Sequence, residues 1–183
     1  MIIFTDFKNA QMSEGEVLAK CFTLYHPQAI YLREKGLSDN DYLSLARQIK
    51  PVCDKIGVDF FVCHKMKIAK LLGVKNLHIS IKELSKIDTK NDFDNISVSV
   101  HSVEEAKLAK EQGATMLVYG HIFVTACKQG LPPRGLEKLK EICDATTLPV
   151  IAIGGIKSTN YVNVLQSGAQ DFAIMSSAMN FTF

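Results

Sequence analysis

Two hydrophobic runs in this chain are each followed by residues that can take part in chemistry. His121 follows the run that ends at Tyr119, and Gly154 and Gly155 follow the run Val150–Ile153. Imidazole can donate or accept a proton near neutral pH, and glycine lets the backbone approach a ligand closely. A helix that begins after such glycines favours an anion at its amino terminus. The pattern predicts proton transfer beside a phosphate pocket, but paired glycines can also form a simple tight turn, and a single histidine can be structural.

Hydroxyl and basic side chains extend this predicted site. Met175, Ser176 and Ser177 follow the last hydrophobic run, and the two hydroxyls can donate hydrogen bonds to phosphate oxygens. Barrel enzymes often bind phosphate with the loops after their last two strands. Thr125 and Lys128 lie between the two runs described above and can face the same pocket or merely cap a loop.

Arg33 and Lys35 follow another hydrophobic run, Ala29–Leu32, and their alternation can place both cations on one side. Arginine can bind a carboxylate or phosphate with two hydrogen bonds, and lysine adds a point charge. The alternative is ordinary solvated charge around Glu34. His78 lies inside an apolar run, and we interpret it as a buried structural histidine.

The chain contains eight short apolar runs that alternate with segments of helical period. This alternation is typical of repeated βα units and a parallel sheet. We therefore expect a (βα)8 TIM barrel formed by residues 1–183 as a single domain, with its active site at the carboxyl ends of the strands. Because few residues follow the eighth run, the last helix is expected to be shortened or missing. The expected strands are Ile2–Thr5, Ala29–Leu32, Asp59–Cys63, Asn76–Ile79, Ile96–Val100, Met116–Tyr119, Val150–Ile153 and Asp171–Met175.

Helix signals lie between several of these runs. Ser38-x-x-Asp41 predicts the start of one helix, which Pro51 should kink or shorten. Ser102-x-x-Glu105 predicts the start of a second helix that runs to Gly113. The segment 85–95 is too polar for a full helix, so the fourth crossover is expected to be short or irregular.

Composition excludes several classes of protein. The 183 residues carry a net charge of +2, without a basic run that would indicate nucleic-acid binding. No apolar run approaches the ~20 residues of a membrane span, and the amino terminus lacks the pattern of a secretion signal. Five cysteines without framework spacing favour reduced thiols. We therefore expect a cytoplasmic protein whose partner is a small molecule. A homo-oligomer is compatible with these features.

Several of these pieces occur together in a known family. The chain resembles the superfamily of thiamin phosphate synthase and the TenI-type thiazole tautomerases. The resemblance implies an α/β barrel that acts on thiamin-pathway phosphates. It also implies ligand contacts at Arg33, Lys35, Ser99, Thr125, Lys128, Gly155 and the Met175–Ser176 loop. The matching segments are Thr5-Asp6, Tyr31–Lys35, Ser99–Ser102, Tyr119–Lys128 and Ile151–Ile156.

The two branches of this family differ at positions that can be read here. Synthases bind magnesium and have Asn-Asp-Arg after the third strand and Gln-x-Asp after the fourth. This chain has Cys63-His64-Lys65 and Ile81-Lys82-Glu83 instead. Magnesium prefers hard oxygen ligands, so this exchange opposes metal binding. Tautomerases carry histidine after the glycine of the sixth strand, as Gly120-His121 does here.

The resemblance therefore favours a thiazole tautomerase, an isomerase that aromatises a carboxythiazole phosphate. His121 would shuttle the proton, Arg33 and Lys35 would hold the carboxylate, and no cofactor would be needed. The loops at Gly154–Gly155 and Met175–Ser177 would hold the phosphate. One alternative is a divergent thiamin phosphate synthase, a transferase that uses Mg²⁺ to couple hydroxymethylpyrimidine diphosphate to thiazole phosphate. Another is a non-catalytic binder or regulator of thiamin-pathway phosphates.

Overall fold

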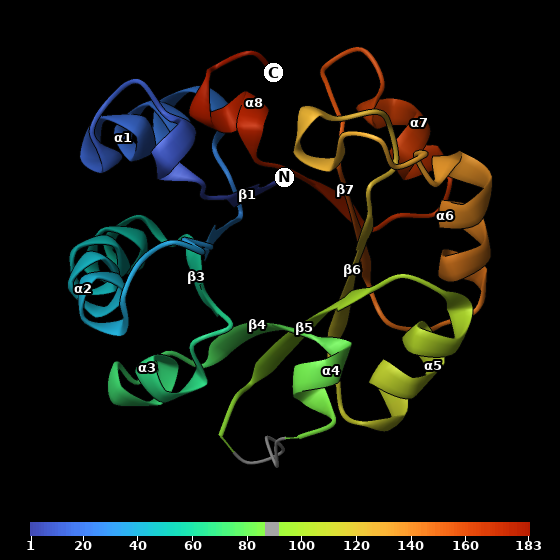
Figure 1. Ribbon diagram of the computed structural model, residues 1–183, viewed down its shortest axis with the longest axis horizontal. Coiled ribbons are helices and arrows are strands. Elements are labelled where there is room, and N and C mark those ends of the chain that lie inside the picture. Colours follow the sequence, from blue (N-terminus) through green and yellow to red (C-terminus); the bar gives the residue numbers. More distant parts are fainter. Residues whose placement is uncertain (87–91) are drawn as a thin grey trace.

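The computed structural model describes residues 1–86 and 92–183. Its eight strands pair in parallel and in sequence order, and β8 pairs with β1 to close a barrel (Figure 1). The expected (βα)8 fold is confirmed. The strands are β1 (Ile2–Phe4), β2 (Ala29–Leu32), β3 (Asp59–Cys63), β4 (Asn76–Ser80), β5 (Asn95–Val100), β6 (Met116–Gly120), β7 (Val150–Ile153) and β8 (Asp171–Ile174). Three of these ranges equal the predicted ones, and the other five differ by one residue at one end.

Helices surround the barrel on its outside (Figure 1). The last of them, α8, is a single turn, as the short carboxyl end predicts. None of the helices in the described ranges combines the length and apolar character that a bilayer crossing requires. They are α1 (Glu14–Tyr25), α2 (Asp39–Ile56), α3 (Met66–Leu71), α4 (Ile81–Leu84), α5 (Val103–Glu111), α6 (Gly135–Asp144), α7 (Tyr161–Gln166) and α8 (Ser176–Met179), with 3-10 turns η1 (Phe7–Asn9) and η2 (Ala126–Lys128).

The helix signals were correct at the caps and wrong at Pro51. The Ser38 hydroxyl accepts the Asp41 N–H at 3.2 Å, and the Ser102 hydroxyl caps α5 in the same way. However, α2 is not shortened at Pro51: it runs from Asp39 to Ile56, 18 residues in all, with the proline inside it. Its buried face, formed by Tyr42, Ala46, Ile49 and Cys53, packs on the barrel on both sides of the proline and outweighs the local cost. The fourth crossover contains α4, and residues 87–91 of that segment lie outside the described residues.

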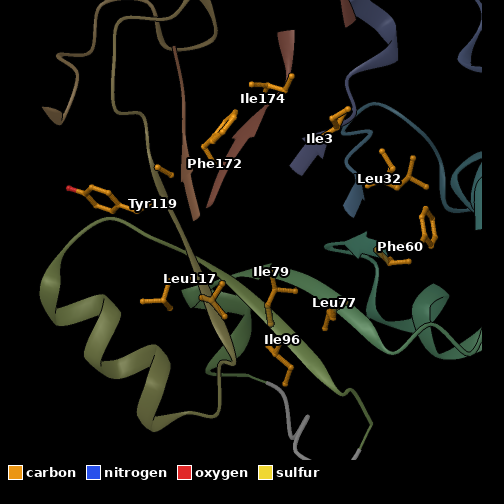
Figure 2. Packing of buried hydrophobic residues seen from close by; sticks show 14 of the residues in the cluster. Ile3, Leu32, Phe60, Leu77, Ile79, Ile96, Leu117, Tyr119, Phe172 and Ile174 are labelled. Carbon is orange, nitrogen blue, oxygen red and sulfur yellow. The ribbon is translucent and has the colours of Figure 1, made fainter. Parts of the chain in front are cut away.

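Alternation along the strands produces two hydrophobic cores. Side chains that point outward pack against the helices, and Figure 2 shows members of this cluster such as Ile3, Leu77 and Leu117. Side chains that point inward fill the barrel, where the Tyr31 ring stacks on Phe61 with centroids 4.1 Å apart. The inner core fills the barrel below the carboxyl ends of the strands, the edge at which barrel enzymes build their active sites.

One buried hydroxyl joins three elements just below the rim. The Tyr42 hydroxyl of α2 donates to the Leu32 carbonyl at 2.6 Å and accepts the Cys63 backbone N–H at 3.0 Å. These bonds fix the ends of β2 and β3, which are followed by Arg33 and His64.

We predict that Tyr42→Phe lowers the free energy of unfolding by about 1–3 kcal/mol, because a buried N–H and a buried carbonyl both lose their partner. Urea unfolding followed by circular dichroism measures this change. The matched control is Tyr161→Phe, because the Tyr161 ring is half-buried and its hydroxyl forms no side-chain hydrogen bond within the described residues. The control should change stability by less than about 0.5 kcal/mol. Equal losses in both variants would contradict the role of the Tyr42 hydroxyl.

Candidate active site

A large cavity opens at the carboxyl ends of the strands. Its volume is about 1350 Å³, and every residue that the sequence pointed to as a candidate lies on its wall. The loops after β2, β6, β7 and β8 and the end of β5 contribute them. These residues are Arg33, Lys35, Ser99, His121, Thr125, Lys128, Gly154, Gly155, Met175, Ser176 and Ser177.

The segment after β2 separates two cations from the carboxylate between them. Arg33 and Lys35 line the cavity. Glu34 is only 8% exposed, and its Oε1 accepts the Phe7 backbone N–H at 3.1 Å. Among the residues that the structure describes, no carboxylate forms an ion pair with either cation. Arg33 and Lys35 therefore present positive charge to the cavity without a direct ion-pair partner.

Contacts across the rim bring a third cation to the same place. Arg33 Nη1 lies 3.5 Å from Met175 Sδ, immediately after β8. On the other side of β8, Cys127 Sγ lies 3.0 Å from Ser176 Oγ. Lys128 is the next residue after Cys127, so the loops after β2 and β6 meet at the Met175–Ser176 segment. Residues nearly a hundred positions apart in sequence thus form one basic wall, made of Arg33, Lys35 and Lys128.

The charges in this wall act on one another. The positive charge of Arg33, partial burial and the positive charge of Lys128 lower the pKa of Lys35 below that of a free lysine. Such a shift means that the cavity disfavours further positive charge. An anion bound between these side chains relieves that repulsion, so the wall is suited to a ligand with several negative charges.

The paired glycines are required by the packing of the chain itself. A Cβ on Gly154 would lie 2.4 Å from the His121 Cβ, and one on Gly155 would lie 2.5 Å from the Val124 carbonyl oxygen. Both glycines also have positive φ, 103° and 68°. The backbone that approaches them is therefore that of the chain's own β6–α6 loop. The helix that follows them, α7 (Tyr161–Gln166), begins six residues after Gly155, so its amino terminus does not directly adjoin the glycines.

His121 and Thr125 both lie in this β6–α6 loop. His121 is half-buried on the same rim as the glycines, and its Nε2 lies 3.4 Å from the Leu131 carbonyl oxygen, a long hydrogen bond. The Thr125 hydroxyl accepts the Cys127 N–H at 3.4 Å and so caps η2 while it lines the cavity. The contacts of both side chains are therefore mainly with the loop itself.

The floor of the cavity contains a polar residue that the sequence reading assigned to structure alone. His78 of β4 is buried, as predicted, but it also lines the cavity. Its Nδ1 lies 2.9 Å from Ser97 Oγ and its Nε2 lies 3.0 Å from Ser99 Oγ. Burial and the nearby charge of His64 lower the pKa of His78 to about 3, so the imidazole is neutral. The sequence contained a signal for this role: Ser97 and Ser99 are two residues apart on β5, so both face the same side as His78 on the neighbouring strand β4.

The resemblance to synthases implies magnesium at the positions of His64 and Glu83. His64 Nδ1 lies 2.7 Å from Glu83 Oε2, and that oxygen also accepts the Ser80 N–H and hydroxyl at 2.8 and 2.6 Å. Magnesium requires oxygen ligands in near-octahedral geometry. In residues 1–86 and 92–183, no group of three or more His, Cys, Asp and Glu side chains can hold a metal ion. The residues at this position therefore do not fit magnesium.

Comparison with known proteins gives consistent similarities. The family model TMP-TENI, described as thiamine monophosphate synthase, matches residues 3–178. The thiamine-phosphate synthase of Coprothermobacter proteolyticus is 36% identical over 155 residues, which cover 83% of this chain and 74% of that protein. The thiamine-phosphate synthase of Clostridium tetani is 29% identical over 153 residues, which cover 82% of this chain and 73% of that protein.

Solved structures show the same similarity. Thiamine phosphate pyrophosphorylase from Pyrococcus furiosus matches with a TM-score of 0.83 and 26% identity, over 97% of this chain and 86% of that one. Thiamine phosphate pyrophosphorylase from Bacteroides thetaiotaomicron matches with a TM-score of 0.68 at 18% identity, over 98% of this chain and 84% of that one. The second likeness supports the fold alone.

The prediction of a thiazole tautomerase, an isomerase, was wrong. The similar curated proteins are named thiamine-phosphate synthases, and that name describes a transferase. The prediction depended on the histidine at Gly120-His121 and on the loss of the synthase carboxylates. A single imidazole on the rim does not distinguish the two reactions, because both were expected to use the same phosphate-binding loops.

We predict that Gly154→Ala lowers the free energy of unfolding by about 2 kcal/mol or more, because the added methyl meets His121 and the positive φ is strained. The matched control is Gly15→Ala in α1, where an added Cβ has no neighbour within 4 Å. That change should be neutral or stabilising. Thermal unfolding of both variants checks this, and a Gly154→Ala protein as stable as the parent would contradict the packing described.

His78 makes the stability depend on pH. Its folded pKa of about 3 lies below the unfolded value of ~6.5, so unfolding takes up a proton between these values. Its contribution is complete above ~6.5 and is lost as the pH falls toward 3. We expect a loss of about 2 kcal/mol between about pH 7 and about pH 5. Urea unfolding at both pH values should show a smaller loss in His78→Gln, and an equal loss would show that His78 is not responsible.

Proposed function

Because this chain belongs to the thiamine monophosphate synthase family, we propose that it is a transferase that joins hydroxymethylpyrimidine diphosphate to thiazole phosphate. The observation that carries the proposal is the basic wall formed by Arg33, Lys35 and Lys128, which lies in one cavity with the hydroxyl-bearing loop after β8. A cavity of about 1350 Å³ holds two small phosphorylated heterocycles side by side.

The proposed reaction is a displacement at carbon. The lone pair of the thiazole nitrogen forms a bond to the methylene carbon of the pyrimidine. The bond from that carbon to the diphosphate oxygen breaks, and its electron pair leaves with the diphosphate. The thiazole becomes a positively charged thiazolium, so no proton has to be transferred. The chemistry therefore needs charge stabilisation of the leaving group more than an acid or a base.

The basic wall is suited to this leaving group. Charge develops on the diphosphate as the carbon–oxygen bond breaks, and cations already fixed in place stabilise that charge without reorganisation. Arg33 is held by its contact with Met175 Sδ at 3.5 Å, and its backbone N–H donates to Thr5 Oγ1 at 2.9 Å. Arginine can bind two diphosphate oxygens at once, while Lys35 and Lys128 add point charges.

The pyrimidine and thiazole rings also need a binding surface, which the floor of the cavity and its remaining loops can provide. Phe4, Val118 and Ala173 give apolar surface, and the neutral His78 holds the Ser99 hydroxyl in place. Ser99 is partly accessible and can bond a ring nitrogen or an amino group of the pyrimidine. The hydroxyls of Ser176 and Ser177 can hold the phosphate of the thiazole partner.

The direct test is formation of thiamin phosphate from the two precursors by the purified protein. We expect product in this assay, and we expect Lys128→Gln to lower kcat/KM by roughly 10- to 100-fold, because one charged hydrogen bond to the leaving group is lost. The matched control is Lys107→Gln on α5, an exposed lysine that does not line the cavity. Normal turnover by Lys128→Gln would exclude the basic wall as the diphosphate site.

A non-catalytic binder of thiamin-pathway phosphates is the second candidate. The observation that favours it is the His64–Glu83 pair at the position where the synthase pattern has two aspartates. Thiazole phosphate binding by calorimetry, without product in the assay, would support this function and contradict the transferase.

A further inference from the structure

The His64–Glu83 pair is bonded more completely than a vacant metal site. Glu83 Oε2 accepts from three donors, which are His64 Nδ1, the Ser80 N–H and the Ser80 hydroxyl. The Ser80 bonds form the capping box that begins α4, so the carboxylate also has a structural role. A metal ion would compete with these donors for Glu83 Oε2, and His64 offers it a nitrogen in place of an oxygen.

His64 is also held in an unusual backbone conformation. Its φ is 60°, in the left-handed region, and its N–H donates to the His78 carbonyl at 2.8 Å. Non-glycine residues rarely adopt this conformation, although Asn, Asp and His do so more readily than others. The conformation directs the imidazole toward α4, where it meets Glu83. Aspartate tolerates the same backbone conformation. Whether this position can bind a metal ion therefore depends on its side chain and not on its backbone.

Positive charge is abundant on the nearby cavity wall. Arg33, Lys35 and Lys128 form no ion pair within the described residues. The carboxylates on the cavity wall, Glu104 and Glu141, come from the helices after β5 and β6, and Glu141 already pairs with Lys138 at 2.8 Å. The end of the cavity at β2 and β8 therefore has three cations available for one anion.

We propose that this chain binds the diphosphate group without a divalent cation, with the charge neutralised by Arg33, Lys35 and Lys128 while the His64–Glu83 pair fills the metal position of the synthase pattern. This inference rests on the proposed function, because it concerns the diphosphate of the same substrate. It distinguishes the chain from family members that use magnesium to bind that group.

The electrostatics of the free cavity support direct binding. Repulsion from Arg33, partial burial and repulsion from Lys128 already lower the pKa of Lys35. A diphosphate placed among the three cations offsets this repulsion, and its binding should raise the pKa of Lys35 again. A metal ion brought in with the diphosphate would instead add positive charge to a wall that already repels it.

The test is calorimetric titration of the purified protein with inorganic pyrophosphate, in EDTA and then in excess MgCl2. We expect binding in EDTA with a Kd within about threefold of the value in magnesium. Lys128→Gln should weaken binding in EDTA by about tenfold or more. Binding that needs magnesium, or that Lys128→Gln leaves unchanged, would overturn the proposal.

A substitution at the pair gives a second, independent arm. His64→Asp restores the pair of carboxylates, so magnesium should then tighten pyrophosphate binding by about tenfold. His64→Asn is the matched control, because it tolerates the same backbone and adds no charge, and it should show no response to magnesium. A His64→Asp protein that folds normally by circular dichroism and ignores magnesium would refute the assignment of the metal position.

These outcomes are separable from failure of the proposed function. Pyrophosphate binding needs no turnover, so the titration tests metal-free binding even if the protein makes no thiamin phosphate. Conversely, thiamin phosphate formation that ceases in EDTA would support the transferase and reject metal-free binding.

Discussion

The contact between the carboxyl ends of β2 and β8 is the constraint on which the site depends. Closure of the barrel through β1 brings Arg33 to Met175, and the β6–α6 loop reaches the same segment through Cys127 and Ser176. Without this closure, the cations that follow β2 and β6 would be solvated separately. The fold thus determines the charge of the cavity, and that charge determines which ligands can bind.

Much of the fold follows from local sequence, because apolar runs of strand length are separated by capped, amphipathic segments. Interactions between loops that are distant in sequence cannot be predicted in this way. Gly154 and Gly155 indicated a backbone constraint, but the partner proved to be the loop at His121 and Val124, which no local pattern specifies. Pro51 predicted a kinked or shortened helix, but the buried face of α2 keeps the helix at 18 residues. The candidate residues do line one cavity, whereas the reaction inferred from His121 was wrong, because one side chain does not distinguish reactions that share phosphate-binding loops.

The site combines two features that are at first sight in conflict. The chain belongs to the thiamine monophosphate synthase family, and three of its cations line one cavity, where we propose that they bind the diphosphate. Yet His64 and Glu83 are bonded to each other where the synthase pattern has metal-binding carboxylates. Charge balance resolves the conflict, because a displacement at carbon needs positive charge near the departing diphosphate and does not require that a metal supply it.

The most direct measurement of this account is a crystal structure of the protein grown with inorganic pyrophosphate and magnesium chloride. The account predicts that pyrophosphate oxygens contact Arg33, Lys35 and Lys128, with the His64–Glu83 bond intact and no metal bridging the anion to Glu83. Pyrophosphate bound elsewhere in the cavity, or a magnesium ion coordinated by Glu83 with His64 displaced, would contradict it.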